Sequence, residues 1–202
     1  MVDPIKKILL KHPSNAFINQ RNINEQYFEL NYLTAPNFNS AISDYEKFVD
    51  LLKSFDIEIH YLPKDNSTSL DSIYTHDPCV VSNKGVVICN MGKKARRPEA
   101  NSMETFFHSI EVPILGKIQS PGILEGGDVV WINEKTIAIG EGYRTNKEGI
   151  EQLKLLLSDQ VETIITVSIP HWNGPDDCLH LMSNLSPIDH DLYLVYTRLL
   201  PV

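Results

Sequence analysis

The segment Cys-Val-Val-Ser-Asn-Lys-Gly-Val-Val-Ile-Cys-Asn-Met, residues 79–91, decides the fold that we expect. Two runs rich in β-forming residues, Cys79–Ser82 and Val86–Met91, flank the short connection Asn83-Lys84-Gly85. Glycine tolerates a positive φ angle, and short connections of this kind join the strands of β-hairpins. The segment therefore predicts an antiparallel pair of strands.

A helical pattern and a third strand follow this hairpin. Apolar residues at spacings of three and four predict an amphipathic helix over Ala100–Ile110; they are Met103, Phe106, Phe107 and Ile110. Pro113 lies just beyond, in the run Val112–Leu115, which predicts a short strand. The resulting order is strand, strand, helix, strand, and we call it a unit.

The unit recurs on both sides of this segment. Downstream, the predicted elements are strands Val129–Ile132 and Thr136–Gly140, helix Lys147–Leu157 and strand Thr163–Ile169. Upstream, they are strands Ile5–Lys11 and Glu29–Thr34, helix Ser40–Phe55 and strand Ile57–Leu62. A fourth hairpin is predicted from strands Leu181–Leu185 and Leu192–Tyr196, and the sequence stops at Val202 before a fourth helix. One unit cannot cover its own apolar face, so units must pack on one another in a ring or curved stack.

Composition limits the class of protein. The chain has 202 residues, of which 42% are hydrophobic and 22% charged, as in ordinary globular proteins. Glycine and proline form no linker, so we expect a single α/β domain over residues 1–202. The net charge of −8 argues against a nucleic-acid surface, and the short basic run Lys93–Arg97 is interpreted as a solvated loop.

The lack of a recognisable targeting signal and the use of cysteine both favour a cytoplasmic protein. No window approaches the ~18 uncharged apolar residues of a membrane span, and Met1–Lys11 lacks the apolar run of a signal peptide. Cys79, Cys89 and Cys178 have no paired spacing, so we expect free thiols in a reducing compartment.

Ionisable residues recur at the junction that precedes each predicted hairpin. The junctions are Tyr74–Pro78, Leu124–Asp128 and Asp176–His180. Because equivalent positions of successive units converge near a common axis, we expect their carboxylates and histidine to meet in one place. Two carboxylates suit a planar guanidinium cation, whose N–H donors pair bidentately with carboxylates. Arg96 and Arg144 could then bind a carboxylate at the other end of an amino-acid substrate.

These residues resemble the guanidine-modifying, or pentein, superfamily, which includes arginine deiminases, dimethylarginine dimethylaminohydrolases and amidinotransferases. The resemblance rests on His76–Pro78, Arg96–Glu99, Leu124–Asp128, Gly142–Asn146 and Leu179–Leu181. It implies a fivefold pseudosymmetric α/β propeller, of which this chain holds about three and a half units. It also implies an active site on the axis and a small cationic guanidino substrate.

The resemblance implies a role for each site residue. Asp77 and Glu125 would hold the guanidinium, and His180 would be the general acid and base. Arg96 and Arg144 would bind the substrate carboxylate, Asp128 belongs to the same substrate-binding set, and Asn15–Asn22 would be a lid. In such enzymes a cysteine attacks the guanidinium carbon, ammonia or an alkylamine leaves, and water hydrolyses the covalent thiouronium. No metal or organic cofactor is implied.

The chain departs from this pattern at two points. The nucleophilic cysteine of relatives lies near the C-terminus, well beyond the position of His180, and it is missing here. Cys79 and Cys89 are expected to be buried, and the family gives Cys178 no such role. His76 stands where deiminases and amidinotransferases usually carry arginine.

These departures leave several hypotheses open. The chain is either a truncated form of a longer protein or a natural short form. An open ring would leave a strand edge uncovered, which predicts a homo-oligomer or poor solubility. The leading function is hydrolysis of arginine or an N-methylated arginine, and the alternatives are amidino transfer and non-catalytic binding. A further alternative is metal-assisted hydrolysis; its ligands would be His76, Asp77, Glu125, Asp128 and His180.

Overall fold

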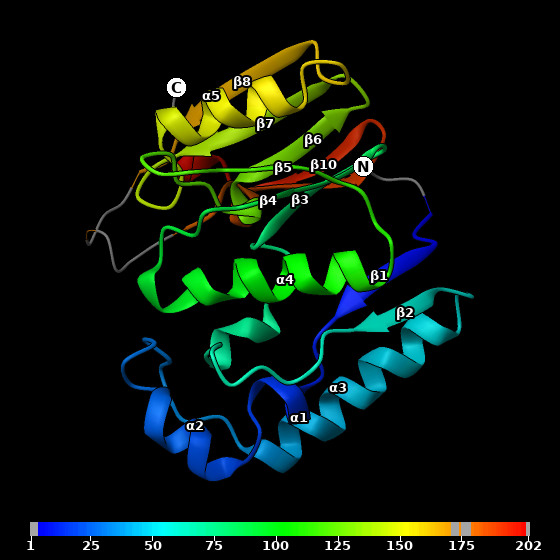
Figure 1. The fold of residues 1–202 in the computed structure, drawn as a ribbon, viewed down its shortest axis with the longest axis vertical. Coiled ribbons are helices and arrows are strands. Elements are labelled where there is room, and N and C mark those ends of the chain that lie inside the picture. Colours follow the sequence, from blue (N-terminus) through cyan, green and yellow to red (C-terminus); the bar gives the residue numbers. More distant parts are fainter. Residues whose placement is uncertain (1–3, 171–173, 175–178, 201–202) are drawn as a thin grey trace.

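Strands and helices alternate along the chain and form an α/β fold with four small sheets (Figure 1). The structure is a computed structural model, and it describes residues 4–170, 174 and 179–200. Asp176, Asp177 and Cys178, which were predicted to lie at the third junction, fall outside the described residues.

The first sheet pairs two strands that are far apart in sequence. Strand β1 (Lys7–Leu10) pairs in parallel with β2 (Glu58–Tyr61). Parallel strands need a long crossover, which is supplied here by three helices. They are α1 (Pro13–Ala16), α2 (Gln20–Gln26) and α3 (Phe38–Lys53).

One predicted strand of this region is wrong. Residues 29–34 form turns between α2 and α3, and no strand is assigned there. Asn31 has a φ angle of 66°, which lies in the left-handed region and interrupts an extended chain. The first unit therefore has two strands rather than three.

The second sheet confirms the unit predicted from residues 79–91. Strands β3 (Cys79–Ser82) and β4 (Gly85–Ile88) pair antiparallel, and β5 (Ile114–Lys117) joins β4 in parallel. Helix α4 (Arg97–Ser109) makes the crossover. It begins three residues before the predicted start, because Pro98 has the φ angle that suits the first helical turn.

The third sheet repeats this arrangement. Strands β6 (Val129–Asn133) and β7 (Thr136–Glu141) pair antiparallel, and β8 (Thr163–Ser168) joins β7 in parallel. Helix α5 (Lys147–Leu156) lies between them in sequence. The Asn146 side chain accepts a hydrogen bond from the backbone N–H of Gly149 at 2.9 Å and so caps the start of α5.

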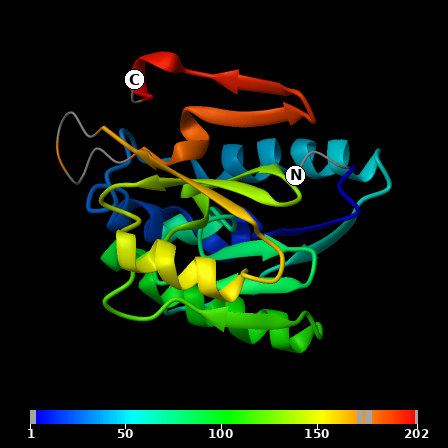
Figure 2. The same ribbon diagram turned by 90° about the horizontal axis from the view of Figure 1, so that it is seen from above.

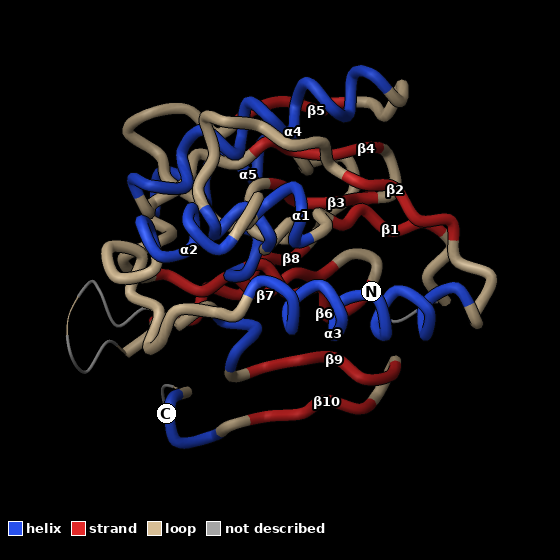
Figure 3. The backbone as a smooth tube through the Cα atoms, turned by 90° about the horizontal axis from the view of Figure 1, so that it is seen from below, coloured by secondary structure: helices blue, strands red, loops and turns tan. Residues whose placement is uncertain are grey.

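The fourth sheet is a hairpin whose first strand differs from the prediction. Strand β9 spans Leu185–Asp189 and pairs antiparallel with β10 (Leu192–Val195). Leu181–Ser183 form a 3₁₀ turn, because the backbone N–H of Leu181 donates to Asp128 and the Leu181 side chain is buried. The hairpin lies at one edge of the molecule (Figures 2 and 3).

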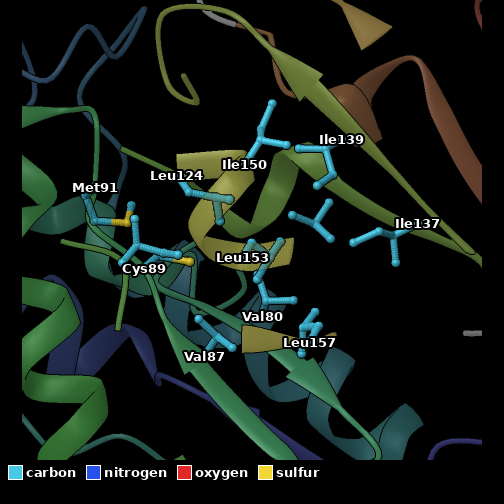
Figure 4. Close-up of a cluster of buried hydrophobic side chains, with 12 residues drawn as sticks. Val80, Val87, Cys89, Met91, Leu124, Ile137, Ile139, Ile150, Leu153 and Leu157 are labelled. Carbon is cyan, nitrogen blue, oxygen red and sulfur yellow. The ribbon is translucent and has the colours of Figure 1, made fainter. Parts of the chain in front are cut away.

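Buried apolar side chains join the second and third sheets. Leu153 of α5 and Leu157, which directly follows this helix, lie beside Val80 and Val87 of the neighbouring sheet, and Ile137 of β7 belongs to the same cluster (Figure 4). This contact holds the start of β3 and the start of β6 together. It therefore positions the two junctions that precede these strands.

Among the described residues, none of the helices combines the length and hydropathy that crossing a membrane requires.

Helix α5 provides a matched test of this packing. Leu153 is fully buried and Leu155 is 74% exposed. We expect Leu153→Ala to lower the free energy of unfolding by about 2–5 kcal/mol, because it leaves a cavity between the sheets. Leu155→Ala should change it by less than about 0.5 kcal/mol. Urea denaturation measures both values, and equal losses would contradict the packing.

Candidate active site

The first two junctions meet, and His180, at the end of the third, lies beside them, as the sequence predicts. The backbone N–H of Gly126 donates to the Asp77 carbonyl at 2.7 Å, which joins the first junction to the second. The backbone N–H of Leu181 donates to the Asp128 carboxylate at 3.0 Å, which joins the third. His180 is thereby held beside the carboxylates of the other two junctions.

The His180 ring lies between two carboxylates. Its Nε2 is 2.8 Å from Glu125 Oε2, and its Nδ1 is 3.8 Å from Asp77 Oδ1. Burial alone would lower the pKa of His180, but the hydrogen bond with Glu125 and the charge of Asp77 outweigh it, so the pKa is raised. The site therefore favours the imidazolium form.

Gly127 makes the approach of His180 to Asp77 feasible. A Cβ atom at this position would lie 2.6 Å from His180 Nδ1 and 2.7 Å from Asp77 Oδ1. At Gly126, a Cβ atom would lie 2.5 Å from the carbonyl oxygens of His76 and Cys79. Both glycines are thus required by close approach of neighbouring groups.

Glu125 is fully buried, and each of its oxygens has a partner. The backbone N–H of Lys93 donates to Oε1 at 3.0 Å, and Nη1 of Arg144 lies 3.3 Å from Oε2, the oxygen that also faces His180. Burial alone would raise the pKa of Glu125. The hydrogen bond from His180 and the charge of Arg144 outweigh burial and hold the pKa at about 2.

Asp128 stabilises the junctions from within the protein. Its carboxylate accepts from the Thr145 hydroxyl at 2.6 Å, and that hydroxyl also accepts from the backbone N–H of Glu125 at 3.2 Å. Burial raises the pKa of Asp128 to about 6. A cavity of about 360 Å³ opens beside these residues. Neither Asp128 nor Glu125 lines it, so both lie behind its surface.

Arg96 is buried in a network of ion pairs rather than in a solvated loop. Its guanidinium pairs with Asp77, donates to Glu99 at 2.8 Å and donates to the Tyr74 carbonyl at 2.9 Å. The interpretation of Lys93–Arg97 as a solvated loop is therefore wrong at Arg96, which is 4% exposed. A buried guanidinium needs such partners, and the network supplies them.

We call the cavity of about 360 Å³ beside these residues the site cavity. Four of its lining residues were predicted as site residues; they are Asp77, Arg96, Arg144 and His180. Six were not predicted; they are Leu30, Asn31, Tyr32, Asp71, Tyr74 and Lys93. Sequence proximity could have indicated Asp71 and Lys93, since each lies a few residues from a predicted site residue.

The predicted lid and His76 are not among the residues that line the site cavity. Residues 15–22, the predicted lid, belong to α1, α2 and their connection and do not line it. His76 is exposed and is not among the lining residues. The chain segment beside the site cavity is instead 30–32, in the connection between α2 and α3.

A larger cavity, of about 640 Å³, lies at the turns of the hairpins. Lys84 and Lys135 of these turns form exposed ion pairs with Asp159 and Glu162. The described carboxylates of the junctions, Asp77, Glu125 and Asp128, do not line it. We therefore assign the chemistry to the smaller site cavity.

Within the described part of the chain, no three or more histidine, cysteine, aspartate or glutamate side chains are arranged to hold a metal ion. Of the ligand set suggested for metal-assisted hydrolysis, His76 is exposed, and Glu125 is already engaged by His180 and Arg144.

The two cysteines described by the structure are poor nucleophiles. Cys79 and Cys89 are both buried, as predicted. Burial raises the pKa of the Cys79 thiol to about 12 and the pKa of the Cys89 thiol well above its ordinary value. The thiolate is the reactive form of cysteine, and it is scarce at both positions near neutral pH.

Thiol labelling tests this conclusion independently of Cys178. In a Cys178→Ser variant at pH 8, we expect no rapid reaction with a disulfide reagent in the native state and reaction of two thiols per chain in denaturant. Absorbance of the released thiol measures both. Rapid native-state labelling of Cys79 or Cys89 would contradict the burial of their sulfur atoms.

The Glu125–His180 contact predicts a shift in titration. Glu125→Gln removes the negative charge beside Nε2, so the pKa of His180 should fall; NMR titration of the ring measures it. Because the folded-state pKa of His180 lies above its ordinary 6.5, its stabilising effect is present at lower pH and lost as the pH rises through the folded value. This loss should be smaller in the variant. The exposed Glu148→Gln is the control, and an equal shift there would refute the assignment.

Comparison with known families gives one match of direct relevance. Residues 67–201 match the family model described as arginine deiminase. The matched region contains the three junctions, both arginines and His180.

Two individual relatives match long stretches of the chain at moderate sequence identity. The dimethylarginine dimethylaminohydrolase of Pseudomonas aeruginosa is 26% identical over 160 residues, which are 79% of this chain and 60% of that protein. An arginine deiminase of Listeria monocytogenes is 33% identical over 132 residues, which are 61% of this chain and 32% of that protein. The chain thus spans less than two thirds of these relatives.

Solved structures share the fold. A mutant of the P. aeruginosa dimethylarginine dimethylaminohydrolase, complexed with citrulline, matches with a TM-score of 0.76 and 24% identity over 95% of this chain and 69% of that chain. The N-terminal domain of ArgZ, a cyanobacterial arginine dihydrolase bound to product, matches with a TM-score of 0.77 and 15% identity over 98% and 68%. At these identities the likeness establishes the α/β fold alone.

Proposed function

The chain belongs to the arginine deiminase family, and we propose that it forms all or part of a hydrolase that cleaves a guanidinium C–N bond in arginine or an N-methylated arginine. The observation that carries this proposal is the placement of Asp77 and His180 on one cavity, with Glu125 directly behind the histidine. Relatives named for the same chemistry support it.

Asp77 is the group that we assign to the substrate cation. One carboxylate oxygen is engaged by Arg96, while the other faces His180 across 3.8 Å at the wall of the site cavity. A guanidinium placed there would donate to this carboxylate, and a paired contact would fix the orientation of its planar carbon. Glu125 contributes its charge indirectly, because it is fully buried.

His180 is the proposed general acid and base. As an imidazolium beside Glu125, it can give a proton to the departing ammonia or alkylamine, and it can then accept one from the attacking water. Glu125, with a pKa of about 2, stays ionised throughout and holds the imidazole in place. Its role is therefore to position His180.

The two arginines differ in how free they are to bind a substrate carboxylate. Nη1 of Arg144 lies 3.3 to 3.4 Å from Glu125, and Arg144 lines the site cavity. Arg96 already bonds Asp77, Glu99 and the Tyr74 carbonyl. We therefore assign the carboxylate to Arg144 first, and we assign to Arg96 the additional task of orienting Asp77.

The covalent step of this proposal requires a cysteine thiolate. Its sulfur attacks the guanidinium carbon, the amine leaves with a proton from His180, and water then releases a ureido product and restores the thiolate. Cys79 and Cys89 do not suit the role, since both are buried with raised pKa values. This observation favours non-catalytic guanidine binding as the second candidate for the 202-residue chain by itself. In amidino transfer, an amine would replace water in the second step.

We also propose that the four sheets are successive units of one incomplete pentein-type propeller domain around the site cavity. The second and third sheets have the same strand order, which supports repetition. Among the described residues, strand β10 pairs with β9 alone and carries exposed apolar side chains at Leu192 and Leu194, which supports the prediction of a homo-oligomer.

Calorimetry of variants tests the guanidinium contact. The ligands are L-arginine and 5-guanidinopentanoate, which share the guanidinium head group. We expect Asp77→Asn to weaken the tighter of the two at least about tenfold, because a charge-assisted hydrogen bond is lost. Asp159→Asn, which removes an exposed carboxylate paired with Lys84, is the control. Unchanged affinity in both Asp77→Asn and Glu125→Gln would overturn the proposed function.

A further inference from the structure

The Lys93 side chain extends into the site cavity and binds two groups there. Its ammonium lies 2.7 Å from Asp71 Oδ2 and donates to the Leu30 carbonyl at 3.1 Å. The same residue donates its backbone N–H to Glu125 at 3.0 Å. Lys93 is thus held at both ends, and all three of Lys93, Asp71 and Leu30 line the cavity.

A carboxylate and a backbone carbonyl are the acceptors that an ammonium group requires. Asp71, which is 4% exposed, and the Leu30 carbonyl would together suit the α-ammonium of an amino acid. In this protein the lysine ammonium already bonds both. An incoming ammonium would have to displace the part-buried Lys93 ammonium from two hydrogen bonds, one of them to a charged partner.

The remaining charges of the cavity favour an anion. Among the described lining residues, the cations are Lys93, Arg96, Arg144 and the imidazolium of His180, and the carboxylates are Asp71 and Asp77. Asp71 is neutralised by Lys93, and the proposed function commits Asp77 to the guanidinium. A carboxylate entering beside Arg144 meets no unpaired anion on these residues, whereas an ammonium meets the like charge of Lys93.

Displacement of Lys93 would also loosen the wall of the cavity. The contact with the Leu30 carbonyl joins Lys93 to the segment 30–32, although the two are 63 residues apart in sequence. An ammonium ligand would have to replace this contact as well. A ligand without that group leaves the wall intact.

From these contacts we propose that Lys93 narrows the proposed function: among guanidino carboxylates, the site prefers a substrate class that lacks an α-ammonium group over arginine. The proposal rests on the proposed function, since it takes the guanidinium to bind at Asp77. The ligand 5-guanidinopentanoate represents this class. It is arginine without the α-ammonium, so the two ligands differ only in the group that Lys93 excludes.

Calorimetry of this ligand pair tests the proposal. We expect the unmodified chain to bind 5-guanidinopentanoate at least about tenfold more tightly than L-arginine. In Lys93→Met, Asp71 and the Leu30 carbonyl become available, so this preference should vanish or reverse. Lys94→Met, which removes an exposed lysine next in sequence, should leave the preference unchanged.

A second variant covers the case in which Lys93→Met does not fold. Asp71→Asn removes the acidic partner and leaves the ammonium of Lys93 in place, so the preference for 5-guanidinopentanoate should increase, with no gain in arginine affinity. A gain in arginine affinity in Asp71→Asn would overturn the proposal.

The outcomes separate this inference from the proposed function. If arginine binds the unmodified chain as tightly as 5-guanidinopentanoate, the inference is overturned and guanidinium binding stands. If the preference exists but persists unchanged in folded Lys93→Met, the assignment to Lys93 is overturned. If neither ligand binds, the proposed function fails and the inference fails with it.

Discussion

The contact between His180 and the fully buried carboxylate of Glu125 is the interaction on which the rest of the site depends. An ionised carboxylate without partners is costly in a protein interior, and removal of one partner of a buried pair costs about 3–5 kcal/mol. Glu125 is tolerated because His180, Arg144 and the backbone of Lys93 supply its partners. These partners come from three separate stretches of chain, so a single side chain holds the junctions together.

The site is a row of alternating charges, and the proposed function follows from that alternation. Each cation lies between two anions or beside one, and the order is Glu99, Arg96, Asp77, His180, Glu125 and Arg144. Neighbouring charges in the row neutralise one another, and Asp77 and His180 each also line the site cavity. A planar cation can therefore bind at one point while a proton donor lies directly beside it.

The scaffold allows this row to form because its backbone approaches very closely at the junctions. Gly127 leaves room for the His180 ring against Asp77, and Thr145 links the Glu125 backbone to Asp128. The apolar contact between α5 and the second sheet keeps these junctions in register. Packing far from the cavity thus determines distances inside it.

The sequence by itself determined the two complete strand-strand-helix-strand units and the meeting of Asp77, Glu125 and His180, because periodicity and junction motifs are local signals that repeat. Tertiary structure alone decided the turn at residues 29–34, the burial of Arg96 and the occupation of Asp71 by Lys93. Lys93 lies 22 residues from Asp71 and 63 from Leu30. Which distant acceptor a side chain reaches depends on how the sheets and loops pack, and no local pattern encodes that distance.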